Sequence, residues 1–373
     1  MIVRAAKVSG AIRLVRGSQW RNDRLLVLCY HGVSMHDEHE WSPELFVSAD
    51  HLRNRLRFLQ RGGYNILPLA EAVTRLYSGT LPPRAVAITF DDGGIDFVRA
   101  ALPILEEFRT PVTLYLTTYY SRKQLPVFDT MLRYVLWTGR MSHTSPPALA
   151  DCGITLHTGD AAARDQTWRA LFNYAEAREL NTVERNALVT RVAHALGVDY
   201  AALVARGTLQ IMPPDTIRDL PSDLVDVQLH THRHRVPRDR ASFVREIHDN
   251  AAAISSSRGT DRPLEHFAYP SGVYHHDAMI WLRECGVRYA TTCHTDLASR
   301  NTDPLLLPRF FDTMLQSPAV FESWVSGFLA LLPRSRASMV ELPNPVRTPG
   351  RSGDICEQTW PKPTESASTV HQP

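Results

Sequence analysis

The sequence lacks any long uninterrupted run of apolar residues. None of its segments approaches the ~18 apolar residues that a membrane-spanning helix requires. The first part, residues 1–23, is basic and mildly amphipathic, and Lys7, Arg13 and Arg16 interrupt its apolar residues. It also lacks the apolar core of ~7–15 residues that a signal peptide would have. We therefore expect an N-terminal helix or extension over 1–23 and a cytoplasmic location. A peripheral membrane contact through this helix stays open.

Cysteine is scarce, and neither sign of charge is in excess. The five cysteines are Cys29, Cys152, Cys285, Cys293 and Cys356. Their odd number and the absence of a CxxC pair are typical of reduced thiols, not of a disulfide framework. Lys and Arg number 41 against 39 Asp and Glu, so the basic excess of a nucleic-acid-binding protein is missing. The basic segment RHRVPRDR (233–240) is confined to one loop, and we expect no nucleic-acid partner.

Apolar runs that favour strands alternate with segments of helical spacing. The strand-like runs are RLLVLCY (24–30), AVAITF (85–90), PVTLYLTT (111–118), DLVDVQL (223–229), HFAYP (266–270), VRYATTC (287–293) and LLLPRF (305–310). Helical spacing occurs over 49–61 and near 241–256 and 277–284. Another helical stretch follows the run 85–90 and ends at about residue 108. This alternation predicts a parallel α/β sheet, either open or closed into a barrel, with chemistry at the carboxyl ends of its strands.

Two parts of the chain depart from this alternation. Residues from about 120 to 219 carry helical patterns without clear strands, which predicts a helical insertion. Beyond Leu332 the composition shifts to Pro, Ser, Thr and Arg, which predicts a disordered tail over 333–373. The remaining residues, 24–332, would form one domain around the insertion.

Two adjacent carboxylates follow a buried run in the motif TFDDGG (89–94). Like charges resist sharing one buried site, so the pair Asp91 and Asp92 is costly unless something compensates it. A metal ion would bind one carboxylate and leave the other free to act as a base. The alternative is an Asp-Gly turn that caps the next helix.

Three histidines follow another strand-like run in LHTHRH (229–234). His230 and His234 are four positions apart, and a turn after the strand can aim both at one point. Two neutral imidazoles and a carboxylate form a good zinc site that leaves positions for water and substrate. In an extended segment all three histidines would share a face, so His232 stays an alternative ligand. A solvated basic loop is the non-functional alternative.

In this order, TFDDG followed by H-[ST]-x-x-H resembles the polysaccharide deacetylase (NodB-homology) family, carbohydrate esterase family 4. The resemblance covers about residues 24–312, with the insertion interrupting it. It implies that residues 24–332 form a catalytic distorted (β/α) barrel of the NodB type. It also implies a metal-dependent hydrolase that removes an N-acyl group, usually N-acetyl, from an amino sugar.

In that family the first Asp of the pair is the general base and the second binds the metal. Carried over to this sequence, Asp91 is the base. The divalent ion, usually zinc, would be held by Asp92, His230 and His234.

The segment HFAYPSG (266–272) departs from the family pattern. Ala268 stands where the family commonly has an Arg that orients the base. A subgroup with the form FAYPxG resembles this sequence, and its orienting Arg comes from a later LPR segment. The run LLLPRF makes Arg309 the candidate here, with a surface cation after a strand as the alternative.

The same segment is expected to provide the substrate and oxyanion contacts. By the resemblance, Ser271 would give its backbone N–H to the oxyanion, next to Gly272. Tyr269 and Pro270 would shape the wall of the site.

Many family members supply the general acid as a His in a late L-x-H motif, which this sequence lacks. The subgroup with an N-terminal YH segment resembles a permuted arrangement in which the first strand delivers this His. LCYHGV (28–33) fits, so His31 is the leading candidate, and His294 in TTCHTD is the second. A structural His at a strand end is the alternative.

The expected partner is therefore an N-acylated carbohydrate, either a glycan or a glycan precursor. One rival hypothesis is a deformylase or other amidase that acts on a lipid-linked amino sugar. Another is a catalytically impaired glycan-binding module, which the missing Arg at position 268 suggests. The sequence carries no signal for an oligomeric state.

Overall fold

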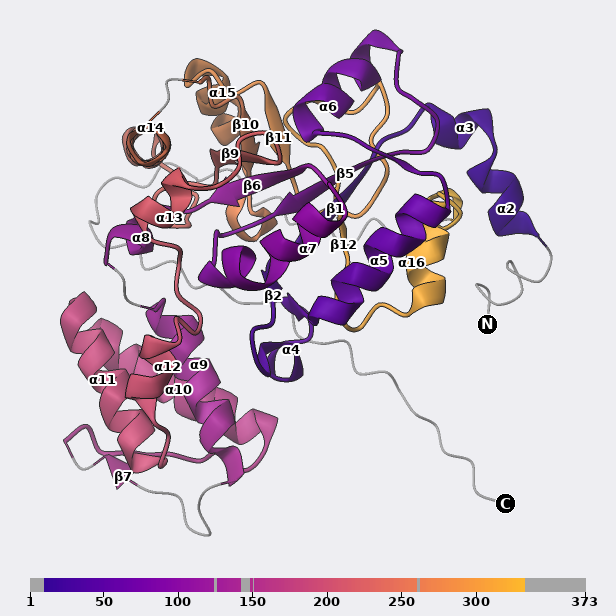
Figure 1. Cartoon of the computed structure of the whole chain (residues 1–373). Coiled ribbons are helices and arrows are strands. Elements are labelled where there is room, and N and C mark those ends of the chain that lie inside the picture. Colours follow the sequence, from indigo (N-terminus) through magenta and orange to yellow (C-terminus); the bar gives the residue numbers. More distant parts are fainter. Residues whose placement is uncertain (1–9, 124–125, 142–147, 150, 260–261, 333–373) are drawn as a thin grey trace, which may run out of the picture. The chain divides into compact units, whose positions relative to one another are not determined.

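A computed structural model describes residues 10–123, 126–141, 148–149, 151–259 and 262–332 (Figure 1). The predicted tail over 333–373 lies outside the described residues, as do the first nine residues of the N-terminal segment. In the part that is described, this segment contains two short helices, α2 (Ala11–Arg16) and α3 (Gln19–Asn22).

A sheet of parallel strands forms the centre of the described structure. Its order is β11-β10-β9-β6-β5-β1-β12. In addition, β4 pairs with the first two residues of β5, Ala85 and Val86. The strands are β1 (Leu26–Tyr30), β4 (Asn65–Ile66), β5 (Ala85–Phe90), β6 (Val112–Leu116), β9 (Val225–Leu229), β10 (His266–Ala268), β11 (Tyr289–Thr291) and β12 (Phe310–Phe311). A parallel bridge between Thr291 and Leu307 links the segment before β12 back to β11. The sheet therefore curves into an incomplete barrel, and the predicted distorted α/β barrel is confirmed.

Each strand that the sequence predicts is present, but the last is short. The run 305–310 suggested a strand, whereas β12 comprises only Phe310 and Phe311. Pro308 has no backbone N–H to give to a ladder, so regular pairing with β1 begins after it. Phe310 and Phe311 pair with Leu28 and Cys29, which places the first strand beside the last.

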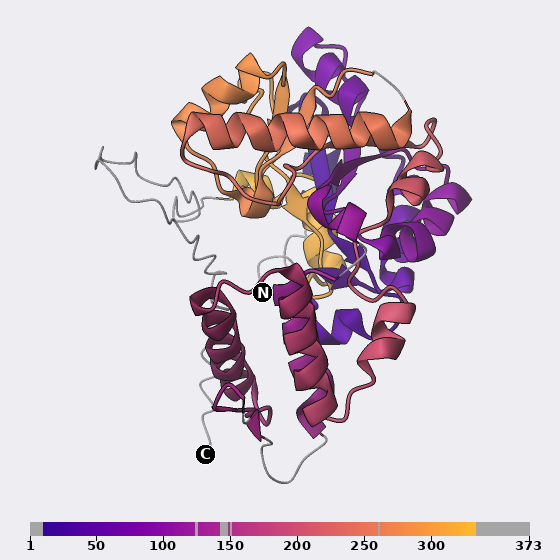
Figure 2. The same cartoon turned by 90° about the vertical axis from the view of Figure 1, so that its left-hand side faces the viewer.

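Helices cover the outer side of the strands (Figures 1 and 2). They are α5 (Ala49–Arg61), α7 (Leu102–Glu107), α14 (Arg240–Arg258), α15 (His276–Glu284) and α16 (Pro318–Val325), with α4 (Glu38–Trp41) in a loop. The buried side chains of α6 (Leu69–Ser78) instead belong to the cluster that contains Ala85 and Ala87. Helix α5 coincides with the predicted range because Ser48 caps its start and accepts a hydrogen bond from the His51 N–H. Its residues Leu52, Leu56 and Leu59 are buried at helical spacing.

A π-helical turn over Phe97–Ala101 precedes α7 in the segment after β5. The short pairs β2 (Gly32–Val33) and β3 (Phe46–Val47) form a separate two-stranded sheet next to the end of β1. Both additions involve too few residues for a hydrophobic period to reveal them.

The predicted insertion is mainly helical and has a core of its own. Its helices are α8 (Tyr119–Lys123), α9 (Phe128–Thr138), α10 (Ala161–Ala177), α11 (Thr182–Ala195), α12 (Tyr200–Ala205) and α13 (Pro214–Arg218). Its buried side chains, among them Leu132 and Leu188, form a hydrophobic cluster distinct from those of the barrel. It also contains one short antiparallel pair, β7 (Ala148–Leu149) and β8 (Ile154–Thr155). Two-residue strands are too short to show an alternating pattern.

Four cysteines are described, and all of them are free thiols: Cys29, Cys152, Cys285 and Cys293. Among the described helices, none combines the length and hydropathy needed to cross a membrane.

Candidate metal and catalytic site

The alternation of side chains along β5 directs Asp91, the predicted base, to the inner side of the sheet. In β5, Ala85 and Ala87 belong to a small inner core, whereas Val86 and Ile88 pack toward the helices. Asp91 follows the strand on the inner side, because successive side chains of a strand point to opposite faces. Its backbone N–H donates to the Tyr30 carbonyl at 3.0 Å, so the pairing with β1 extends to this residue.

Three predicted metal ligands converge after β5 and β9, the two strands that flank β6 in the sheet. The Oδ1 atom of Asp92 lies 3.2 Å from Nε2 of His230 and 3.2 Å from Nε2 of His234. The two imidazole centroids are 4.9 Å apart. Among the described residues, only these three form a His, Cys, Asp or Glu group close enough to hold a metal ion.

This geometry fits a zinc ion. Ligand atoms held ~2.0–2.1 Å from a tetrahedral zinc ion lie about 3.3–3.4 Å from one another, close to the 3.2 Å observed. The Asp92 Oδ1 atom is buried and has no hydrogen-bond donor in suitable geometry among the described residues. Its lone pairs are therefore available to a cation. The side chains of Asp92 and His234 are 37% and 30% exposed, so one side of the site faces solvent.

The first histidine is held with its metal-binding nitrogen free. His230 Nδ1 lies 2.8 Å from the Ala268 carbonyl oxygen, an acceptor only, so Nδ1 carries the proton. Its Nε2 then presents a lone pair toward Asp92 and His234, as in most protein metal sites. Ala268 thus contributes its backbone carbonyl, although its side chain has none of the function of the family Arg.

Helix α14 fixes the loop that carries the histidines, a role for which the sequence offered no motif. Asn250 accepts from the His230 N–H at 2.9 Å and donates to the Leu116 carbonyl at 2.9 Å. Glu246, 1% exposed, accepts hydrogen bonds from Arg233 and Arg235. These two arginines are therefore part of the support of the site and not a freely solvated basic loop.

His232, the alternative ligand, points elsewhere. Its Nδ1 lies 2.8 Å from the Thr118 hydroxyl, and its ring contacts the edge of Tyr119. It is absent from the group of potential metal ligands. The segment turns instead of remaining extended, because His234 has a positive φ of 55° and Thr231 one of 61°.

Asp91 is held by Arg309, the residue predicted to replace the missing family Arg. Nη1 and Nη2 of Arg309 donate to Oδ1 and Oδ2 of Asp91 at 2.7 and 2.8 Å. The guanidinium also donates to the Thr292 carbonyl and the Thr89 hydroxyl. Arg309 is 0% exposed, so the alternative of a surface cation is wrong. Burial alone would raise the pKa of Asp91, but Arg309, together with His230 and His31, lowers that pKa, so the carboxylate is ionised.

Asp91 is thus held by the guanidinium of Arg309, while Asp92 is directed to the histidines. Burial alone would also raise the pKa of Asp92, but His234 and His230 hold it well below its usual range. The like-charge cost that the sequence implied is relieved for Asp91 by a guanidinium. For Asp92 it is relieved by His234, whose own pKa the carboxylate raises against the effect of burial.

His31 follows β1 beside the two aspartates, and its ring lies 5.6 Å from that of Phe311. Burial lowers the pKa of His31, while the carboxylates of Asp92 and Asp91 oppose this shift. The second candidate acid, His294, accepts from the Arg309 backbone N–H through its own carbonyl. Its ring Nδ1 is buried and has no partner among the described residues.

The 266–272 segment turns sharply next to His230. Ser271 is exposed and has a positive φ of 54°, and Gly272 has one of 67°. A Cβ on Gly272 would lie 2.5 Å from the Cβ of Cys293, so this position requires glycine. Pro270 is buried.

The expectation that the Tyr269 side chain lines the wall of the site was wrong. Its ring is 0% exposed and packs against Phe267 and Tyr274 in the core. Tyr269 follows β10 on the outer side, because the Ala268 position before it faces inward. Tyr269 therefore supports the 266–272 segment from the side of the core.

Several of these residues have strained backbones. Asp92 has a positive φ of 71°, in addition to His234 and Ser271. Such conformations cost on the order of 1–3 kcal/mol each in non-glycine residues and cluster at functional sites. Here the surrounding hydrogen bonds hold them in place.

Comparisons with known proteins identify the family of the chain. The sequence profile of the family described as polysaccharide deacetylase matches residues 78–290. The chain belongs to the polysaccharide deacetylase family. The family is named for enzymes that deacetylate polysaccharides. The finer FAYPxG subgroup stays a prediction.

Among curated relatives, the Escherichia coli K12 poly-β-1,6-N-acetyl-D-glucosamine N-deacetylase is 30% identical over 101 residues. That alignment covers 26% of this chain and only 14% of the relative.

Two solved structures share the fold. The Streptococcus pyogenes deacetylase PplD in complex with acetate superposes with a TM-score of 0.53 at 17% identity, covering 83% of this chain and 99% of that one. A de-N-acetylase from Aggregatibacter actinomycetemcomitans gives 0.50 at 15% identity, covering 81% and 99%.

Proposed function

We propose that this polysaccharide deacetylase removes an N-acetyl group from an amino sugar with the help of a divalent metal ion, preferably zinc. The observation that carries the proposal is the convergence of Asp92, His230 and His234 next to a separately held carboxylate, Asp91. When bound, the ion would polarise the amide carbonyl and lower the pKa of water at the site. The solvent-facing side of the three ligands leaves room for water and substrate.

Residues of the chain would carry out the proton transfers and stabilise the oxyanion. Asp91 accepts the proton of the attacking water, and the fork of Arg309 keeps both carboxylate oxygens in a fixed orientation. The Ser271 backbone N–H stabilises the oxyanion of the tetrahedral intermediate. His31 gives a proton to the departing nitrogen as the carbon–nitrogen bond breaks. Acetate and a free amino sugar are the products.

The substrate class follows from the relatives and from the organisation of the chain. The curated relative acts on poly-β-1,6-N-acetyl-D-glucosamine, so glycans of N-acetylglucosamine are the first substrates to test. A cytoplasmic location would favour a soluble or lipid-linked precursor over finished polymer. The helical insertion leaves the barrel directly after β6, whose following residues Thr117 and Thr118 contact His232. We therefore include this insertion, within the 24–332 catalytic domain, as a specificity element.

The test is a screen of acylated sugars with the zinc- or cobalt-loaded protein. Substrates would be β-1,6-linked N-acetylglucosamine oligosaccharides, N-acetylated sugar nucleotides and lipid-linked sugars, with N-formyl counterparts. Release of acetate in preference to formate, abolished in Asp91→Asn, is expected. Preference for formate would indicate a deformylase. Stoichiometric metal without release of either acid would favour a glycan-binding module.

A further inference from the structure

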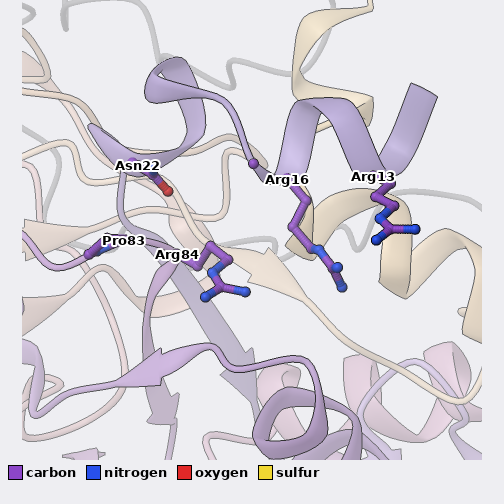
Figure 3. A pocket seen from close by; sticks show the side chains of 6 residues that line it. Arg13, Arg16, Asn22, Pro83 and Arg84 are labelled. Atoms are coloured by element: carbon purple, nitrogen blue, oxygen red, sulfur yellow. The ribbon is translucent and has the colours of Figure 1, made fainter. Parts of the chain in front are cut away.

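A hollow lined by arginines lies at the opposite end of β5 from the catalytic carboxylates. Its volume is about 310 Å³, and Figure 3 shows Arg16 and Arg84 extending into the same space, with Arg13 one turn further along α2. Arg84 directly precedes β5, whereas Asp91 directly follows it. The six residues of β5 separate the two places by about 20 Å at ~3.3 Å per residue.

The positive charges of this hollow are not compensated within the described structure. Among the described residues, no carboxylate forms an ion pair with Arg13, Arg16 or Arg84, although 14 of the other described arginines do. Arg84 donates to the Gly62 carbonyl, which holds the side chain without neutralising it. Like charges that are gathered in this way repel one another unless an anion joins them.

A buried hydroxyl adds an independent sign of a missing ligand. Tyr64 is 7% exposed, and its hydroxyl is buried without a hydrogen-bond partner among the described residues. Burial raises the pKa of Tyr64, and the charges of Arg21, Arg16 and Arg84 oppose this rise, while Glu322 of α16 adds to it. The hydroxyl therefore lies within the field of the same arginines. An unsatisfied buried polar group of this kind calls for a partner such as a bound anion or water.

The backbone around the hollow is also strained. Arg84 has a positive φ of 55°, a conformation that costs a non-glycine residue on the order of 1–3 kcal/mol. In this conformation its guanidinium reaches Gly62 and borders the hollow.

We propose that Arg13, Arg16 and Arg84 form a binding site for a phosphate group, separate from the deacetylase site. Guanidinium forks match phosphate oxygens in pairs, and three of them suit a group with more than one negative charge better than a single carboxylate. The volume lies at the lower end of the ~300–1,000 Å³ of small-ligand sites. The phosphate belongs either to a soluble compound or to a lipid headgroup. Leu14, 77% exposed beside Arg13, is a residue that could enter a lipid surface.

The position of this site has a consequence for catalysis. A phosphate group bound at the amino ends of the strands leaves the carboxyl ends, with Asp91 and the metal ligands, open to substrate. Loss of the site should therefore leave the turnover of a small soluble substrate unchanged.

The test uses the full chain in two assays. Titration calorimetry with inorganic pyrophosphate measures soluble phosphate binding, and cosedimentation compares vesicles of phosphatidylcholine with vesicles that also contain phosphatidylglycerol. Arg16→Gln and Arg84→Gln remove one charge each from the hollow. Arg245→Gln, at an exposed position of α14 that forms no ion pair with a described residue, is the matched control.

We expect each hollow variant to weaken binding roughly tenfold, the size of one charged hydrogen bond, and the control to bind as the wild type does. Binding of pyrophosphate without recruitment to vesicles assigns the site to a soluble phosphate compound. Recruitment to phosphatidylglycerol vesicles that both variants lose assigns it to a headgroup. The proposal is overturned if the wild type shows neither response. It is also overturned if binding survives in both variants, or falls equally in Arg245→Gln. Because Arg16 donates no described hydrogen bond, Arg16→Gln keeps the test valid even if Arg84→Gln destabilises its loop.

Discussion

Arg309 and Asp91 are 218 positions apart in the sequence, yet their side chains meet through two parallel hydrogen bonds of 2.7 and 2.8 Å. Both side chains are buried, at 0% and 3% exposure. The contact connects the strand that carries the first carboxylate with the segment that leads into β12. It compensates the missing Arg at position 268, because a guanidinium reaches the same carboxylate from another part of the chain.

Removing one member of this pair should destabilise the protein strongly. Arg309→Met leaves a buried carboxylate without its partner, which typically costs roughly 3–5 kcal/mol in the free energy of unfolding. The double variant Asp91→Asn/Arg309→Met leaves no unpaired charge, so it should recover part of that loss. Urea unfolding of the two single variants and the double variant would measure this coupling. Additive effects of the two substitutions would show that the pair contributes nothing beyond its separate side chains.

Asp91→Asn should retain the metal and lose most of the turnover. Asn has the same shape but cannot accept the proton of water, and a positioned base typically contributes ~10²–10⁴-fold. Elemental analysis and kcat on an N-acetylated sugar would be measured on the same preparation. Near-normal kcat would remove Asp91 from the role of base. Loss of the metal would mean that the roles of Asp91 and Asp92 are exchanged.

His234→Ala should remove most of the metal, because it deletes one of three ligands. His232→Ala is a matched control from the same loop, since His232 bonds Thr118 and is turned away from the ligand group. We expect metal content close to one ion per chain in the control and a large loss in His234→Ala. The reverse pattern, measured by elemental analysis after dialysis, would make His232 the ligand.

The sequence predicted the fold and the inner residues of the site better than it predicted the residues that hold them in place. Runs such as 85–90 and 49–61 were recognisable because they are long enough to show a period. Asp91 and His230 follow such runs directly, so strand alternation aims both to the inner side. Asp92 reaches the histidines only because its backbone turns, with a φ of 71°.

The supporting residues could not be read from the sequence in the same way. Asn250 and Glu246 lie in the middle of α14 and bind loop residues that are 20 and 13 positions earlier, so no local motif marks them. The resemblance placed Tyr269 at the wall of the site, whereas the alternation in β10 turns its ring into the core. Arg309 was found only through the resemblance, because its partner is remote in sequence.

His266 should make the folded state sensitive to acid. Burial lowers its pKa to about 4, and its ring lies 5.0 Å from that of Tyr289. As the pH falls, the unfolded chain binds a proton near pH 6.5, whereas the folded chain binds it only near pH 4. Stability is therefore lost between these values, by up to about 3 kcal/mol. His266→Phe should show a smaller loss of unfolding free energy between pH 7 and 4.5 than the wild type. An equal loss in the two proteins would contradict the assignment, and exposed His248→Gln serves as the control.

His31 stands apart from the other catalytic candidates in sequence, and its proposed role depends on the pairing of the first strand with the last. That pairing places His31 after β1, next to Asp91 and within the field of both aspartates. An amine is a poor leaving group unless it is protonated, so the effect of losing His31 should depend on the substrate. His31→Ala should cripple the hydrolysis of an N-acetyl sugar while sparing an activated aryl acetate, whose phenolate leaves without a proton.

The pH–rate profile gives a second measure of the same role. His31→Ala should lose one limb of a bell-shaped profile while its metal content is unchanged. His294→Ala is the matched control, because His294 contacts Arg309 through its backbone carbonyl, which the substitution preserves. We expect it to keep both limbs and the normal ratio of amide to ester hydrolysis. Equal losses on amide and ester in His31→Ala would make His31 a structural residue. If His294→Ala instead showed the selective loss on the amide, the proton donor would be His294. The donor would then belong to the segment before β12 and not to the end of the first strand.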